Sequence, residues 1–179
     1  MSEHIEAKPT EYRGVQFKSR LEARWAVFFD YYHMVNEWAY EPTTLSMPEK
    51  GWNYTPDFKI DYIGHHLLFE VKPVEVTEEH HYLLDCFGAR LASTPLLLGT
   101  GDFYNSDIKV ENITLGLKPE LLLKAFPSCE ESADIASKYR FDIPYIPPAF
   151  RRGSGAKFRE VVARQQAILR QEERKKRKK

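Results

Sequence analysis

The chain contains little cysteine and no long hydrophobic run. Only Cys86 and Cys129 occur among 179 residues, far apart and without a Cys-x-x-Cys spacing, which argues against a disulfide framework or a zinc ribbon. No stretch of eighteen apolar residues is present, so we expect no transmembrane helix. The first residues lack the apolar segment of a secretory signal. We therefore expect a cytoplasmic protein without membrane contact.

An excess of charge of either sign is also absent, because the formal net charge is zero. The charges are nevertheless unevenly distributed. Residues 1–150 contain 14 Lys and Arg against 23 Asp and Glu, a net charge of −9, whereas residues 151–179 contain 12 against 3, a net charge of +9. A basic segment of this kind is typical of an arm that contacts a polyanion.

The length corresponds to one domain with an appendage. Hydrophobic residues make up 42% of the chain and aromatic residues 13%, enough for a packed core. We divide the chain into a flexible N-terminus (1–12), a core (13–100), an irregular or helical elaboration of that core (101–150), and a basic C-terminal helix and tail (151–179).

Apolar periodicity and capping residues predict the elements. Ser19 and Glu22 have the spacing of a capping box, and apolar residues then recur at helical spacing as far as Tyr32. A second helix is expected after Thr77, a good N-cap. Strands are expected over 38–47, 54–62 and 67–72 and from Pro95 to Leu98, with one further strand or hairpin within 108–117. Helices are expected over 119–126, 132–139 and 156–174.

Two short motifs contain the chemistry. Pro56-Asp57 opens one expected strand, and Glu70-Val71-Lys72 ends the next. Glu70 and Lys72 are two residues apart, so on an extended chain they point to the same side, while the alternate apolar residues point to the other. If the two strands pair, Asp57 and Glu70 meet. Two close carboxylates with open positions suit Mg²⁺ better than a soft metal.

This Pro-Asp and Glu-x-Lys pattern resembles that of the PD-(D/E)XK nuclease superfamily. The Ser19-x-x-Glu22 segment and the segment 38–42 also resemble a subgroup that includes phage and mobile-element nucleases and transposase cutting subunits. The resemblance covers roughly the first hundred residues. It implies an α/β fold: a restriction-endonuclease-like αβββαβ core with a central mixed four-stranded sheet, here followed by a C-terminal helical extension.

The resemblance implies a nuclease that uses Mg²⁺ or Mn²⁺ to hydrolyse phosphodiester bonds. Asp57, Glu70 and the backbone carbonyl of Val71 would hold the metal, with Glu22 as a further ligand, and Lys72 would position the attacking water. Two simpler explanations remain open. A capping box alone accounts for Glu22, and Lys72 is equally suited to a salt bridge with a neighbouring carboxylate. The adjacent His80 and His81 lack zinc-ligand spacing.

The partner is expected to be DNA rather than RNA, by resemblance alone. The basic end of the chain, which includes Lys175, Lys176, Arg177, Lys178 and Lys179, is expected to contact phosphates. A protein partner or self-association would also use such a segment. The main alternative is a non-cutting nucleic-acid-binding or assembly protein that keeps the nuclease fold, and the acidic first 150 residues leave it open.

Overall fold

The computed structural model describes residues 7–32, 34–73, 76–91, 94–101, 103, 108–114 and 130–142. In chain order the elements are β1 (Thr10–Tyr12), β2 (Val15–Phe17), α1 (Arg20–Tyr31), β3 (Val35–Tyr40), β4 (Leu45–Met47), η1 (Pro48–Lys50), β5 (Trp52–Tyr54), β6 (Phe58–Tyr62), β7 (His65–Lys72), α2 (Glu78–Arg90), β8 (Leu96–Thr100), β9 (Lys109–Asn112) and α4 (Glu130–Lys138).

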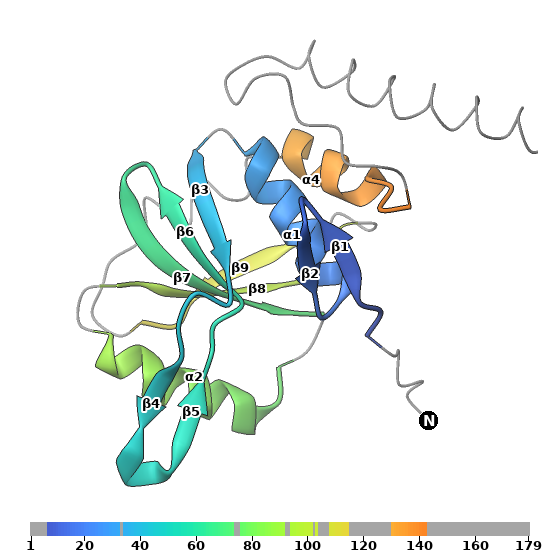
Figure 1. The fold of residues 1–179 in the computed structure, drawn as a ribbon. Helices are drawn as coiled ribbons and strands as arrows, with labels where there is room; N and C mark the ends of the chain where they lie inside the picture. Colours follow the sequence, from blue (N-terminus) through green and yellow to red (C-terminus); the bar gives the residue numbers. More distant parts are fainter. Residues whose placement is uncertain are drawn as a thin grey trace, which may run out of the picture.

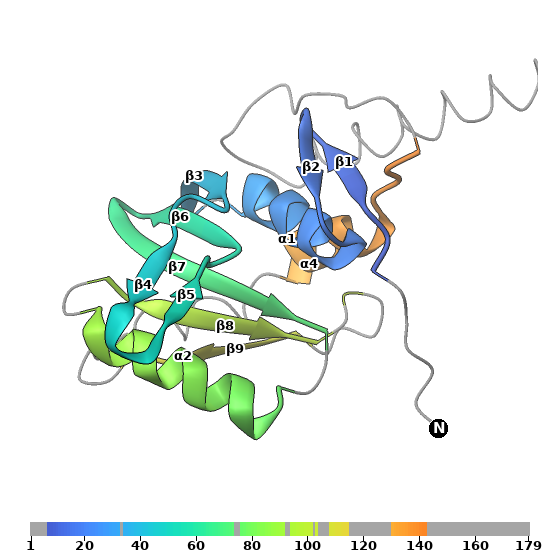
Figure 2. The same cartoon turned by 60° about the horizontal axis from the view of Figure 1, so that its bottom comes forward.

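A five-stranded sheet in the order β3-β6-β7-β8-β9 forms the centre of the fold. In this sheet β7 and β8 run parallel, and the other neighbours run antiparallel. Helices α1 and α4 cover one face, together with the β1–β2 hairpin, and α2 covers the other (Figures 1 and 2). The predicted α/β class and mixed sheet are confirmed. The structure has five strands where four were expected, because β9 pairs with the edge of β8.

An aromatic core fills the face of the sheet toward α1. Trp25 of α1 lies 4.8 Å from the ring of Phe69 of β7, measured between ring centroids, and both side chains are fully buried. Gly99 of β8 makes this packing possible. A Cβ atom there would lie 2.5 Å from the Phe69 ring and 2.8 Å from Trp25, closer than any real contact, so only glycine fits at this position.

Both principal helices begin at the predicted capping residues. The Ser19 side chain accepts a hydrogen bond from the backbone N–H of Glu22, and the Thr77 side chain accepts one from His80. Each cap satisfies one of the N–H groups that a helix leaves without a partner. Glu78 and Glu79 occupy the first turn of α2, where negative charge is favoured.

Two of the predicted strands are wrong as single elements. The expected strand 38–47 is split into β3 and β4, and the expected strand 54–62 is split into β5 and β6. Glu41 breaks the first at a backbone φ of +44°, outside the strand region. Pro56, which cannot donate to a sheet ladder, lies within the second break. Strands β4 and β5 therefore leave the main sheet as a separate hairpin that lies beside α2 (Figure 2).

Helix α4 is held against α1 by a buried arginine. The Arg24 side chain is 5% exposed and donates hydrogen bonds to the backbone carbonyls of Ala136 and Ser137. A cation at the C-terminal end of a helix complements the helix dipole. The expected helices 119–126 and 156–174, and the basic residues Lys175–Lys179, lie outside the described residues. No helix in the described part of the chain could cross a membrane.

Candidate active site

The two sequence motifs come together at one edge of the sheet. Phe58 of β6 pairs with Phe69 of β7, so Asp57, one residue before Phe58, lies opposite Glu70. The Asp57 carboxylate accepts a hydrogen bond of 2.8 Å from the backbone N–H of Val71. Residues that are opposite on neighbouring strands share a face. Asp57 and Glu70 therefore face the α2 side together.

Glu70 is a buried carboxylate with polar partners. It is 3% exposed. Lys72 Nζ lies 2.7 Å from its Oε1, and the Tyr54 hydroxyl donates to its Oε2 at 2.7 Å. Burial raises the pKa of Glu70, but the polar contacts of His80, Lys72 and Tyr54 outweigh it and hold the pKa below its usual value. Glu70 is therefore ionised at neutral pH.

At Asp57, the influences that raise the pKa outweigh those that lower it. Burial and the neighbouring Glu70 charge raise the pKa of Asp57 to about 8, against the lowering effects of the Val71 N–H and of Lys72. Glu22 raises the same pKa further. Burial is the largest of these influences, and Lys72 offsets only part of it. A cation bound beside Asp57 would favour its ionised form.

Glu22 reaches the same region from α1. Its carboxylate accepts hydrogen bonds from the Lys18 backbone N–H, the Ser19 hydroxyl and the Tyr40 hydroxyl, at 3.1, 2.7 and 2.5 Å. Glu22 therefore contacts the start of its own helix, at Ser19 and at the preceding Lys18. It also raises the pKa of Asp57, so it lies close to the site as well.

The charges of the whole cluster are unbalanced. Lys18 forms an ion pair with Glu41, and its pKa is raised, first by that contact and also by Glu22 and Asp57. The cluster thus contains four carboxyl groups (Glu22, Glu41, Asp57 and Glu70) and two lysines (Lys18 and Lys72), and when all six groups are ionised the excess is two negative charges. A divalent cation would neutralise this excess.

The donor set fits a hard divalent ion. Within the described residues, no three His, Cys, Asp or Glu side chains are arranged as a complete cage for a metal. Mg²⁺ does not need one, because it is usually bound through one or two carboxylates and keeps several waters. The N–H and C=O of one strand residue point to the same side, so the Val71 carbonyl faces the same edge as Asp57. That placement fits the expected backbone ligand.

Sequence reasoning missed two residues at Glu70. Tyr54 reaches it because the chain leaves the sheet before β6, and no local pattern indicates this. For His80, the sequence argued only against a zinc site and predicted no contact with Glu70. Its Nε2 atom is buried and has no hydrogen-bond partner among the described residues. It lies 3.6 Å from Glu70 Oε1, just beyond hydrogen-bond length. The position of His80 on the inner side of α2, one turn from Leu84, is the signal that could have placed it.

Comparison with known proteins adds no relative. No protein-family model matches the chain, and neither a curated protein nor a solved structure matches it. The case for a function therefore depends on the geometry of the cluster itself.

Proposed function

We propose that the protein is a metal-dependent nuclease that hydrolyses phosphodiester bonds, most simply those of DNA. The observation that supports this best is the pairing of Asp57 with Glu70 beside Lys72, where burial and the Glu70 charge raise the pKa of Asp57. The chain order α1, β3, β6, β7, α2, β8, with an inserted hairpin, follows the αβββαβ order of the superfamily that the motifs resemble. Fold order alone does not define function, so the proposal relies on the site.

Each residue has a role that its position allows. Asp57 and Glu70 would hold Mg²⁺ or Mn²⁺, with the Val71 carbonyl and Glu22 as the further candidate ligands. When bound, the metal supplies positive charge that polarises a phosphoryl oxygen and makes water more acidic. Tyr54 fixes the orientation of Glu70 through its hydroxyl. Lys72 would orient the attacking water and offset the negative charge that develops on the phosphoryl group.

A cleavage assay tests the proposal directly. Plasmid, linear double-stranded and single-stranded DNA, and an RNA of matched length, are incubated with the protein in Mg²⁺, Mn²⁺ or EDTA. We expect cleavage with either metal and none in EDTA. The Asp57→Asn variant should lose cleavage, because the amide is a poor ligand for a hard cation. Asp85→Asn is the matched control, since Asp85 is an exposed carboxylate on α2.

The same assay distinguishes a nuclease from a non-cutting nucleic-acid-binding or assembly protein. A protein that shifts DNA in a gel without cutting it under any metal condition would be a binding or assembly protein. Equal cleavage by the parent and Asp57→Asn would show that the cluster is not the active site. Thermal unfolding of both variants in EDTA shows whether each is folded.

A further inference from the structure

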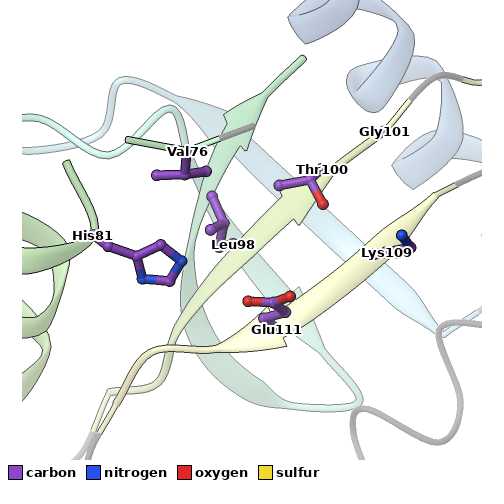
Figure 3. Close-up of a pocket in the computed structure, with 7 residues that line it drawn as sticks. All are labelled: Val76, His81, Leu98, Thr100, Gly101, Lys109 and Glu111. Atoms are coloured by element: carbon purple, nitrogen blue, oxygen red, sulfur yellow. The ribbon is translucent and has the colours of Figure 1, made fainter. Parts of the chain in front are cut away.

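A small cavity opens beside the cluster, between α2 and the strands β8 and β9. Its volume is about 190 Å³. Figure 3 shows His81 of α2 on one side and the side chains of β8 and β9 on the other. The side chains that line it are those of Val76, His81, Leu98, Thr100, Lys109 and Glu111.

The cavity lies on the same face of the sheet as the candidate active site. Glu70 pairs with Leu98 and Leu98 with Glu111, while Lys72 pairs with Thr100 and Thr100 with Lys109. Paired residues share a face, and neighbouring strands are about 4.8 Å apart. The β9 side of the cavity is therefore roughly 10 Å, two strand spacings, from β7.

Helix α2 connects the two places. His80 contacts Glu70, and the next residue, His81, lines the cavity. A polymer whose phosphate lies at Glu70 and Lys72 would thus bring its next unit over the cavity.

The lining suits a nucleobase better than a phosphate. Val76 and Leu98 are apolar, and His81 has a flat ring on which a base can stack. Thr100, Lys109 and Glu111 provide a hydroxyl, a cation and a carboxylate. The cation and the carboxylate together add no net charge, so the cavity has no excess positive charge for a phosphate. They do provide a donor and an acceptor, and the edges of bases present both kinds of group.

The size limits the ligand to a single ring system. Sites for drug-sized molecules usually measure about 300–1,000 Å³, and this cavity is smaller. A base pair has no room there, so a base that enters must first be unpaired.

We propose that this cavity, the base pocket, receives one unpaired nucleobase of the strand whose phosphate lies at Asp57, Glu70 and Lys72. The inference rests on the proposed nuclease function and narrows its substrate class to nucleic acid that is single-stranded or unpaired near the cut. In an intact duplex the base would have to leave the stack, at a cost of a few kcal/mol. Single strands, flaps and mismatched sites avoid that cost.

Binding measurements with two substitutions at one position test the base pocket. Glu111 is exposed on the edge strand β9, so a larger side chain there leaves both cores intact. Glu111→Trp fills the pocket, and Glu111→Gln removes the charge while keeping the size. The probes are a fluorescein-labelled 12-nucleotide DNA and the same sequence as a duplex. Anisotropy is measured in Ca²⁺, and a denaturing gel confirms that the DNA stays intact.

We expect the parent to bind the single strand at least tenfold more tightly than the duplex. Glu111→Trp should lose that preference, with at least a tenfold weaker affinity for the single strand, and Glu111→Gln should stay within about threefold of the parent. A central 2-aminopurine should change its fluorescence on binding to the parent and much less on binding to His81→Ala. A calorimetric titration with Mn²⁺ should give the same affinity for Glu111→Trp as for the parent.

Two results would overturn the base pocket: equal affinity of the parent for the single strand and the duplex, or unchanged single-strand binding by Glu111→Trp. These are distinct from failure of the nuclease proposal, which would appear as no metal-dependent cutting of any substrate by the parent. A parent that cuts, with a Glu111→Trp variant that cuts and binds single strands equally well, removes the base pocket alone.

Discussion

The two faces of β7 are equally buried and chemically opposite. The Phe69 side chain points toward α1 and is 0% exposed. The Glu70 side chain points toward α2 and is 3% exposed. Around Phe69, the rings of Trp25 and Phe29 of α1 pack against its side chain. Around Glu70 the partners are polar, and burial together with the Glu70 charge raises the pKa of adjacent Asp57 to about 8. Burial alone therefore does not distinguish core from site. The difference is whether the buried group already has all the partners that it needs.

The largest expected effect is on catalysis at the α2 face. Lys72→Ala should lower the cleavage rate at least 10²–10³-fold, the usual effect of removing a group that stabilises charge in the transition state. Lys72 is not a proposed ligand, and its removal frees Glu70 Oε1. Calorimetry should therefore show Mn²⁺ affinity equal to or higher than that of the parent. A variant that loses metal binding together with cleavage would show that Lys72 only supports the structure of the site.

The next largest effect is on stability at the α1 face. Phe69→Ala should lower the free energy of unfolding by about 3–5 kcal/mol, because it leaves a cavity against Trp25. Gly99→Ala should cost about 1–3 kcal/mol through overpacking of the same rings. Denaturant unfolding measures both. If Phe69→Ala cost no more than the conservative Asp85→Asn, the α1-face core would not be packed as described.

A third effect is the pH dependence of stability without metal. The pKa of Asp57 is about 8 in the folded protein and about 3.9 in an unfolded chain. Between these values the folded state binds more protons than the unfolded state, so the contribution of Asp57 to stability is present below about pH 4 and is lost as the pH rises to about 8. Denaturant unfolding in EDTA should show that Asp57→Asn removes this fall.

Bound metal should restore the stability that the protein loses as the pH rises. At pH 8.5, Mg²⁺ favours the ionised carboxylate, so it should raise the melting temperature of the parent and not that of Asp57→Asn. Equal melting shifts in the two proteins would place the ion elsewhere.

The sequence predicted much of the arrangement of β7 and little of the surroundings of Glu70. Alternation along the strand placed Glu70 and Lys72 on one face, and the Ser19 and Thr77 caps gave both helix starts, because these features are local. The breaks at Glu41 and Pro56 were missed, since propensity does not show when a strand leaves one sheet for another.

Those breaks move the β4–β5 hairpin and bring Tyr54 to Glu70. His80 likewise reaches Glu70 only through the packing of α2 on the sheet. The raised pKa of Asp57 follows from its burial and from the nearby charge of Glu70, so it too could be read only from the fold.

The smallest expected effect is a difference in the free energy of unfolding between two variants, each of which removes the hydroxyl of a buried tyrosine on one face of the sheet. Tyr54→Phe removes the hydroxyl that donates to charged Glu70, and should cost about 1.5–3 kcal/mol, the usual value for a hydrogen bond to a charged group. Tyr32→Phe is its counterpart on the α1 face, where the hydroxyl lies 3.5 Å from that of Tyr62. A long contact between neutral groups should be worth about 0.5 kcal/mol or less. Denaturant unfolding at pH 7 in EDTA compares them. Equal losses in the free energy of unfolding would mean that the hydrogen bond from Tyr54 to Glu70 is no stronger than the contact between the two neutral hydroxyls.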